Sequence, residues 1–383
     1  MDMINRLLII ADDVTGAMDT GVCFSAAGIS TRVYLPQGKI EKDREESVSV
    51  CVLDTRHVSP EKAYEAVHGF VSEVRDLGFT YFYKKTDSAL RGNPGAELSA
   101  MKDALGTEKI HFLPSYPLMN RLTKGGVHYI NGVPVSESVF SRDPFNPVTM
   151  SDVRQILESQ GDADGIEVYD AATDDDLRSI ASELIGEGET AFAGCAGLAG
   201  VLPDILDLPR THKEVEPHCG TMMVMCGSVN PISLIQCNAA EKRGYPRYHL
   251  DTEAGAAAQI GQISFGVIEE QMAILDTGSS DVTGEGIDER MKTVAAEMAK
   301  RASGVMRSVE DMMMFIIGGD TMLEFLRQNG VTELVPHPTP FPGTVLGSIE
   351  IDGKERYMLS KSGGFGEPDL IEKVFERMIS AQK

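Results

Sequence analysis

Short apolar runs alternate with longer segments of helical periodicity, and this pattern constrains the fold most strongly. Five runs occur early in the chain, at 7–11, 31–35, 48–53, 79–83 and 110–113. Ser59-Pro60-Glu61, followed by apolar residues at helical spacing as far as Val74, predicts a crossover helix between two runs. Strands joined by helices form a mainly parallel sheet that binds ligands beyond the carboxyl ends of its strands. The predicted fold class is therefore α/β.

The alternation stops once and then resumes, which predicts two domains. Between about Asn120 and Thr149, Gly, Asn and Pro residues indicate a long functional or disordered loop. Residues 209–217 are charged and contain Pro, and are typical of a linker. A second α/β series follows. We expect two α/β domains with mainly parallel sheets flanked by helices, residues 1–208 and 218–383, with the active site in the cleft between them.

The net charge restricts the partners and the compartment. With 35 Lys and Arg against 58 Asp and Glu, the formal charge is −23, which repels nucleic acid and anionic membranes. The six cysteines form no C-x-x-C pair, and the apolar run at the N-terminus is too short for a signal peptide. We expect a cytoplasmic protein without a nucleic-acid or membrane partner, and a homodimer is one candidate assembly.

Polar residues cluster where the strands of the first domain are predicted to end. Asp12, Asp13 and Asp19 follow the first run, together with Thr15 and Gly16. The other clusters are Thr55-Arg56, Lys84 to Ser88 with Arg91 to Asn93, and Ser115-Tyr116. A single Asp after a strand is usually a helix cap or a turn former. An Asp pair at one strand end with Lys, Asp and Arg at another indicates the rim of a pocket.

These residue types suit a small acid. Arg56 and Arg91 offer planar forks that match a carboxylate, and Lys85 offers a point charge. Asp87 is then a candidate acceptor for the proton of an attacking hydroxyl, a role that contributes roughly 10² to 10⁴ in rate. The alternative, a simple Asp87–Arg91 ion pair on one helical face, stays open at this point.

Glycine-rich turns mark the second domain. They are Cys226-Gly227-Ser228, Gly318 to Thr321 and Ser360 to Gly366, and each follows an apolar run and precedes a helical segment. Backbone N–H groups of such turns approach phosphate closely, while Ser228, Thr321 or Ser362 adds a hydroxyl and Lys361 a charge. Each turn alone is more often an ordinary tight turn. Three of them at equivalent positions indicate a nucleotide site.

Other fingerprints are weak. No segment matches the P-loop pattern. Residues 194–200 resemble a dinucleotide loop, but the glycine spacing is wrong and Pro203 interrupts the helix, so a close packing turn between strand and helix is favoured. The histidines show no metal-ligand spacing, and only His128, in the predicted loop, suits a site.

Several motifs resemble the four-carbon acid sugar kinases. Residues 11–21 (ADDVTGAMDTG), 84–93 (KKTDSALRGN) and 127–134 (VHYINGVP) resemble the N-terminal domain of that family. Gly318-Gly319-Asp320-Thr321 and residues 361–366 (KSGGFG) resemble its C-terminal nucleotide-binding domain. The motifs occur in the family's order across nearly the whole chain.

The resemblance implies ATP-dependent phosphorylation of the terminal hydroxyl of threonate, erythronate or a 3-oxo-tetronate. It also implies that Asp12 or Asp13, Arg56 and residues 85–88 contact the sugar acid. Two departures are visible: the chain is shorter than many relatives before Gly318, and Gly363-Gly364-Phe365 stands where many relatives have Gly-Asn-Phe. The Lys84-Lys85 doublet and the Gly-Gly-Phe ending favour a D-threonate type of substrate.

The sequence thus predicts a carbohydrate-acid kinase, a transferase that uses ATP and Mg²⁺, with no metal ligands assigned in the protein. We assign catalysis to Asp87 and Asp13. The predicted substrate-binding residues are Asp12, Asp13, Arg56, Lys85, Thr86, Asp87, Ser88, Arg91 and His128. The predicted nucleotide-binding residues are Ser228, Gly318, Gly319, Asp320, Thr321, Lys361, Gly363 and Gly364. Two alternatives are a dinucleotide-dependent oxidoreductase of a small hydroxy acid and a non-catalytic sugar-acid sensor.

Overall fold

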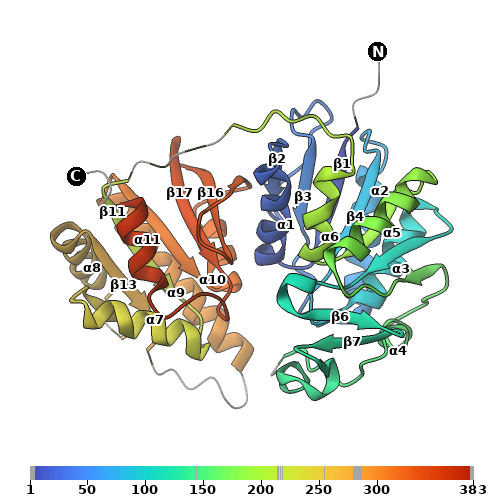
Figure 1. Cartoon of the computed structure of the whole chain (residues 1–383). Coiled ribbons are helices and arrows are strands. Elements are labelled where there is room, and N and C mark those ends of the chain that lie inside the picture. Colours follow the sequence, from blue (N-terminus) through green and yellow to red (C-terminus); the bar gives the residue numbers. More distant parts are fainter. Residues whose placement is uncertain are drawn as a thin grey trace. The chain divides into compact units, whose positions relative to one another are not determined.

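The computed structural model divides the chain into two compact units, Met1–Lys213 and Glu214–Lys383. It describes residues 5–143, 145–213, 215, 217, 219–253, 255–278 and 287–379. Each unit has its own strands and its own helices (Figure 1). No helix among these residues is long and apolar enough to cross a membrane.

The first unit is built on a parallel sheet. In chain order its strands are β1 (Leu7–Ala11), β2 (Thr31–Tyr34), β3 (Val48–Val52), β4 (Tyr81–Lys85), β5 (Ile110–Leu113), β9 (Ile166–Val168) and β10 (Ala191–Gly194). They lie side by side in the order β2-β3-β1-β4-β10-β5-β9, and every neighbouring pair is parallel. The mainly parallel α/β sheet predicted from the alternating pattern is therefore confirmed.

Helices cover both faces of this sheet, as parallel connections require. In one group, α6 (Ala196–Val201) contacts both α1 (Val14–Ala26) and α5 (Asp174–Gly186). In the other group, α3 (Pro94–Leu105) contacts both α2 (Pro60–Val74) and α4 (Val153–Glu158). Helix α2 begins after Ser59, whose side chain accepts a hydrogen bond from the Lys62 N–H, and Pro60 occupies its first turn, as the sequence predicts.

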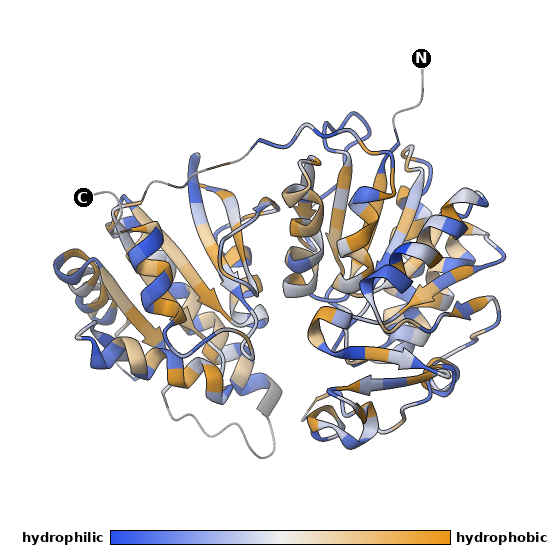
Figure 2. Cartoon of the chain, in the orientation of Figure 1, coloured by the Kyte–Doolittle hydropathy of each residue, from blue (hydrophilic) through white to orange (hydrophobic). Residues whose placement is uncertain are grey.

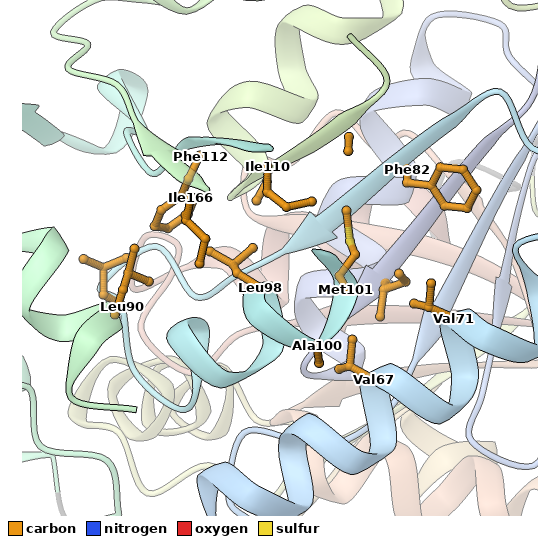
Figure 3. Close-up of a cluster of buried hydrophobic side chains, with 14 of the residues drawn as sticks. Val67, Val71, Phe82, Leu90, Leu98, Ala100, Met101, Ile110, Phe112 and Ile166 are labelled. Atoms are coloured by element: carbon orange, nitrogen blue, oxygen red, sulfur yellow. The ribbon is translucent and has the colours of Figure 1, made fainter. Parts of the chain in front are cut away.

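Apolar side chains between α2, α3 and the sheet form the core of the first unit. Figure 3 shows Val67 and Val71 of α2 and Met101 of α3 in this cluster, with Phe82 and Ile110 from the strands. Apolar residues concentrate in the strands and polar residues along the outer helices (Figure 2). This rigid layer fixes the strand ends from which the polar side chains of the site project.

Strand β4 lies two residues later than the sequence predicts, at Tyr81–Lys85 rather than 79–83. Lys84 and Lys85 therefore belong to the strand and are both buried. Lys84 is accommodated because its ammonium lies 2.8 Å from the Glu97 carboxylate of α3. A lysine is expected in an exposed loop unless a buried carboxylate pairs with it. The sequence alone does not show that Glu97 is such a partner.

The predicted long loop at 120–149 is wrong. Three short antiparallel strands occupy much of it: β6 (Arg121–Lys124), β7 (Val127–Ile130) and β8 (Val133–Pro134). Gly125-Gly126 and Asn131-Gly132 form the tight turns, with positive φ at all four residues. Such residue pairs are typical of two-residue hairpin loops. The sequence therefore carries a hairpin signal here that the irregular-loop interpretation does not use.

The second unit has a mixed sheet. Its strands are β11 (Thr221–Cys226), β12 (Arg247–His249), β13 (Met272–Asp276), β14 (Met312–Ile317), β15 (Glu333–His337), β16 (Thr344–Ile351) and β17 (Lys354–Lys361). Their order is β12-β13-β11-β14-β17-β16-β15, in which only β16 runs antiparallel to its neighbours. The helices are α7 (Pro231–Lys242), α8 (Ala256–Glu270), α9 (Ile287–Ser308), α10 (Gly319–Gln328) and α11 (Leu370–Met378).

The two units share one arrangement of strands. In each, the first four parallel strands in chain order lie in the order second, third, first, fourth. The sequence shows no repeat, so the common feature is the topology and not the residues. This order fixes where each unit is able to bind a ligand.

Candidate functional site

In the first unit, the connections that leave β1 and β4 run in opposite directions. The chain passes from β1 through α1 toward β2, and from β4 through α3 toward β5. Neighbouring strands whose connections diverge leave a crevice at their carboxyl ends, which is where doubly wound sheets bind ligands. Ala11 is paired with Lys85, so Asp12 and Asp13 lie beside the turn that contains Asp87.

Arg56 holds both acids of this edge. Its Nε donates to Asp12 Oδ2 at 2.7 Å, and its Nη1 and Nη2 lie 2.9 and 2.8 Å from the two oxygens of Asp13. Burial by itself would raise the pKa of Asp12, but the positive charges of Arg56, Lys85 and Lys84 outweigh it and lower that pKa. The guanidinium predicted to bind a substrate carboxylate is therefore already occupied by protein carboxylates.

Asp87 and Arg91 are paired, though not on a helix. Arg91 donates through Nε and Nη2 to the two oxygens of Asp87 at 3.0 and 2.8 Å, and through Nη1 to Asp143 at 3.0 Å. The residues lie in a turn before α3, with Leu90 at φ +62°, so the ion pair of the alternative interpretation is present but the shared helical face is not. Burial opposes ionisation of Asp87, but Arg91 and Arg56 prevail and hold its pKa well below the usual range.

Lys85 lies under the first turn of α1. Its Nζ donates to the Thr86 carbonyl at 2.7 Å, and a Cβ added to Gly16 would lie only 2.7 Å from that nitrogen. Asp13 caps the helix, because its carboxylate accepts from the Gly16 N–H at 2.9 Å. Glycine at position 16 therefore lets the α1 backbone approach the lysine ammonium.

Thr86 and His128 support the turn from behind. The Thr86 hydroxyl donates to the Gly194 carbonyl at 3.2 Å. His128 is fully buried on β7, with Nε2 3.0 Å from the Ser88 carbonyl and Nδ1 3.1 Å from the Thr123 hydroxyl. Burial lowers the pKa of His128 to about 4, so the ring is neutral near pH 7. Both ring nitrogens already have protein partners, which favours a positioning role over the direct substrate contact that we predicted.

Sequence reasoning missed Arg121, because this residue lies in the segment interpreted as a loop. It stands at the start of β6, and its Nη1 donates to the Ser88 hydroxyl. Among the described residues this is the one hydrogen bond of its guanidinium group, which also lies over the Phe140 ring. The Arg56 guanidinium, in contrast, is shared among three carboxylates and that of Arg91 between two. Arg121 is therefore the arginine of this edge with donors left for a ligand.

The second unit has the equivalent crevice between β11 and β14. The chain leaves β11 through α7 toward β12 and leaves β14 through α10 toward β15, again in opposite directions. Cys226 is paired with Ile317, which brings Gly227 beside Gly318. A Cβ on Gly227 would overlap the Thr321 hydroxyl, and a Cβ on Gly363 would overlap the Ser228 hydroxyl. The three predicted glycine turns therefore meet, and their contact excludes larger residues.

Gly318 begins α10 with φ +117°, a conformation that L side chains rarely adopt. The N–H groups of the first turn of α10 are thus presented at the crevice, as in phosphate-binding helix termini. Asp320 is exposed in that turn, and Thr321 is buried against Gly227. This part of the arrangement matches the predicted chemistry of a phosphate cradle.

Lys361 differs from its predicted role. It is buried, and its ammonium donates to the carbonyls of Ser362, Gly363 and Phe365 at 3.0 to 3.3 Å. Burial lowers its pKa to about 8. Lys361 therefore stabilises the glycine loop through the loop's own carbonyl groups. Its charge would act on a bound phosphate by electrostatic attraction and not by direct contact.

A further cluster at this edge had no assigned role. Asp276, fully buried at the end of β13, accepts from Arg247 Nε at 2.7 Å and lies 2.5 Å from His249 Nδ1. The His249 side chain is 61% exposed. Within the described residues, no group of three His, Cys, Asp or Glu side chains is arranged to hold a metal ion.

The glycines at 194–200 form a packing turn, as predicted. A Cβ on Gly194 would lie 2.6 Å from the Leu113 carbonyl oxygen, and one on Gly197 would overlap the Ser115 carbonyl. Gly194 and Gly197 therefore allow α6 to pack closely against the carboxyl end of β5. The oxidoreductase alternative loses the feature on which it rested.

Known proteins with similar sequences include a sugar-binding domain family and several kinases. Residues 7–167 match the family described as Sugar-binding N-terminal domain. A D-threonate kinase from Bordetella bronchiseptica is 27% identical over 405 aligned positions, which cover 95% of each chain. A D-erythronate kinase from Heliobacterium modesticaldum is 35% identical over 159 positions, which span 41% of this chain and only 36% of that relative.

A solved structure shows the same fold. A protein described as a putative tRNA synthase from Salmonella typhimurium LT2 superposes with a TM-score of 0.79 at 20% identity, covering 98% of this chain and 99% of the other. The chain is thus a doubly wound α/β protein. Over nearly its whole length it is similar to D-threonate and 3-oxo-tetronate kinases, in agreement with the resemblance found in its motifs.

Proposed function

We propose that this protein is an ATP-dependent kinase that phosphorylates the terminal hydroxyl of a four-carbon sugar acid. The observation that carries the proposal is the pair of equivalent crevices in one chain: a charged one in the first unit and a glycine-lined one in the second. A phosphoryl-transfer enzyme must position two anions and stabilise charge on the phosphoryl group, which these two chemistries suit. The curated relatives that align over most of the chain are kinases.

The sugar acid is assigned to the first unit. The carboxylate groups of Asp12 and Asp13 are held in place by Arg56, so they are suited to accept hydrogen bonds from sugar hydroxyls. For the substrate carboxylate we propose Lys85 and Arg121 in place of Arg56 and Arg91, because both predicted forks already bind protein carboxylates. Ser88, whose hydroxyl accepts from Arg121, supplies a further hydroxyl.

The nucleotide is assigned to the second unit. The turns at Gly227-Ser228, Gly318 to Thr321 and Gly363-Gly364 would surround the phosphates with backbone N–H groups. Mg²⁺ bound with ATP would neutralise phosphate charge, and the exposed Asp320 carboxylate beside the cradle has the oxygen chemistry this ion prefers. Transfer further requires that the bound hydroxyl reach the terminal phosphate.

D-threonate is the substrate we favour. Relatives named D-threonate kinase are 25 to 27% identical over 95 to 98% of the chain, slightly more than the 23 to 24% of 3-oxo-tetronate kinases aligned over 96 to 97%. The Lys84-Lys85 and Gly363-Gly364-Phe365 motifs support the same choice. The D-erythronate kinase is more identical, but over part of the chain only. D-erythronate and 3-oxo-tetronates are therefore the competing substrates.

The test is ADP release from ATP and Mg²⁺ with D-threonate, D-erythronate and 3-oxo-tetronates in parallel. The proposal predicts acid-dependent ADP formation, with the highest kcat/KM for D-threonate. Binding of a sugar acid without ADP release would indicate the sensor alternative. Stabilisation of the protein by NADH and not by ATP would indicate the oxidoreductase, since a ligand that binds only the folded state raises Tm.

A further inference from the structure

Four aspartates surround the crevice of the first unit, and three of them are tied to arginines. Asp12 and Asp13 are bound by Arg56, and Asp87 by Arg91. The fourth is Asp19. Among the described residues, its carboxylate has no hydrogen-bond or ion-pair partner, although its solvent exposure is only intermediate. An unpaired carboxylate in a mostly covered position is unfavourable unless it binds a proton or a ligand donor.

The position of Asp19 places it at the crevice. It lies in α1 three residues after Gly16, hence on the same helical face, and a Cβ added to Gly16 would lie only 2.7 Å from the Lys85 ammonium. The electrostatic neighbours of Asp19 come from different strand ends: Lys85 is the last residue of β4, Asp13 follows β1 and Arg56 follows β3. The carboxylate is therefore directed toward the strand ends, where the substrate is proposed to bind.

The surroundings of Asp19 set its ionisation. The groups around it are Lys85, Asp13 and Arg56, together with Tyr116 after β5 and, on the inner side, Cys23 of α1. Burial raises the pKa of Asp19 to about 7, and the negative charge of Asp13 acts in the same direction, against the two cations. Asp87, in contrast, has a pKa far below the usual range and is a weak proton acceptor.

We propose that Asp19 is the catalytic base that accepts the proton of the sugar acid's terminal hydroxyl, and that Asp87 positions Arg91 instead. This inference rests on the proposed kinase function. In the step, the hydroxyl O–H bond breaks and its proton moves to an Asp19 carboxylate oxygen, while the alcohol oxygen bonds to the γ-phosphorus. The bond from that phosphorus to the β–γ bridging oxygen breaks, its electron pair leaves with ADP, and Asp19 later returns the proton to solvent.

The test is Asp19→Asn in the full-length protein, which keeps the shape and removes the basic oxygen. We expect kcat to fall by about 10² to 10⁴, with the KM for ATP and the Kd for D-threonate changed less than threefold. In the wild type, kcat/KM should rise with pH through about 7, because Asp19 must lose its proton to act. The residual activity of Asp19→Asn should lack this limb. Asp19→Glu, which restores a carboxylate, should recover part of the rate.

Two comparisons make the outcome decisive. Asp103→Asn, at an exposed aspartate of α3 that hydrogen-bonds Tyr64, should leave kcat unchanged. Turnover of Asp19→Asn within threefold of wild type, or a wild-type profile without a limb near pH 7, would overturn the inference while leaving the kinase assignment intact. If the wild type releases no ADP with any four-carbon acid, the proposed function itself fails.

Discussion

The two crevices have the same topology and opposite chemistry. Both lie where the connections that leave the first and fourth parallel strands diverge, with the strands in the order second, third, first, fourth. In the first unit, the strand ends carry carboxylates and cations that are mostly paired with one another. In the second unit, the equivalent strand ends carry glycines so close together that a Cβ would overlap a neighbouring hydroxyl.

The difference between the two sets of strand ends shows how one fold is adapted to two kinds of ligand. A sugar acid is recognised through the directions of its hydroxyls, so acceptors held rigidly by buried arginines are of use. A triphosphate is recognised through many backbone N–H groups, which requires that side chains be absent. The topology fixes the place of each site, and the residues at the strand ends fix its chemistry.

The largest effect is expected at Arg56. Replacement by Met leaves the buried Asp12 and the partly exposed Asp13 without their shared guanidinium, and breaking the buried Arg56–Asp12 pair in this way costs about 3 to 5 kcal/mol. We expect a matching loss of unfolding free energy in denaturant and no measurable kinase turnover. Arg178→Met, at an exposed ion pair with Asp204, is the control and should change stability by less than about 1 kcal/mol.

The corresponding change in the glycine-lined crevice is Gly227→Ala. The added Cβ overlaps the Thr321 hydroxyl, so β11 and α10 must separate and the cradle opens. We expect kcat/KM for ATP to fall by about 100-fold, equivalent to roughly 2.7 kcal/mol, while the Kd for D-threonate stays within threefold. Gly261→Ala on α8, where nothing lies within 4 Å, is the matched control. A weaker sugar-acid affinity in Gly227→Ala would argue against separate sites.

An intermediate effect is expected from His128 as a function of pH. Its folded-state pKa of about 4 lies below the ordinary value of 6.5, so the unfolded chain binds the proton first and stability falls as pH decreases through this window. By pH 5 this loss is about 2 kcal/mol. Asp19, with its raised pKa, contributes oppositely, since its protonation stabilises the folded state in the same range.

The difference between His128→Gln and wild type isolates the first contribution. Unfolding in denaturant at several pH values should show the variant gaining about 2 kcal/mol relative to wild type between pH 7.5 and pH 5. His68→Gln, at a partly exposed histidine of α2 that stacks on Tyr64, is the matched control variant. Equal pH slopes for wild type and His128→Gln would contradict the neutral, buried state of this ring.

The smallest effect concerns Lys361. Its pKa of about 8 means that its charge is lost as pH rises above 8, and the attraction of the glycine loop for phosphate weakens. We expect the KM for ATP to rise a few-fold between pH 7.5 and pH 9, while folding stability rises between pH 8 and the ordinary lysine value near 10.5. A Lys361→Met variant should lose the change in KM. A wild-type KM that is flat across this range would remove Lys361 from the account.

The sequence predicted what depends on local pattern. The alternation of apolar runs and helices gave the α/β class, and the turns at Gly227, Gly318 and Gly363 were found because glycine is needed wherever a backbone must approach closely. The polar edge of the first unit was also located. These features depend on residues that are close together in the sequence, so they can be predicted without knowledge of tertiary contacts.

What could not be predicted depends on partners far apart in the chain. Arg56 reaches Asp12 across 44 residues, and Lys84 reaches Glu97 on a different element, so the occupied guanidinium and the buried lysine were both invisible. Arg121 was overlooked because Gly125-Gly126 was not recognised as a hairpin turn. Asp19 was seen as part of a cluster, but its lack of a partner emerges only from the packed structure.

Hydrogen exchange of the full-length protein, with each ligand alone, tests the central claim most directly. The account predicts that D-threonate slows exchange in peptides around residues 12–19 and 84–93, and that a non-hydrolysable ATP analogue with Mg²⁺ slows it around 226–231, 318–322 and 361–366. Protection of the charged strand ends by the nucleotide, with the glycine turns unaffected, would contradict the division of labour between the two crevices.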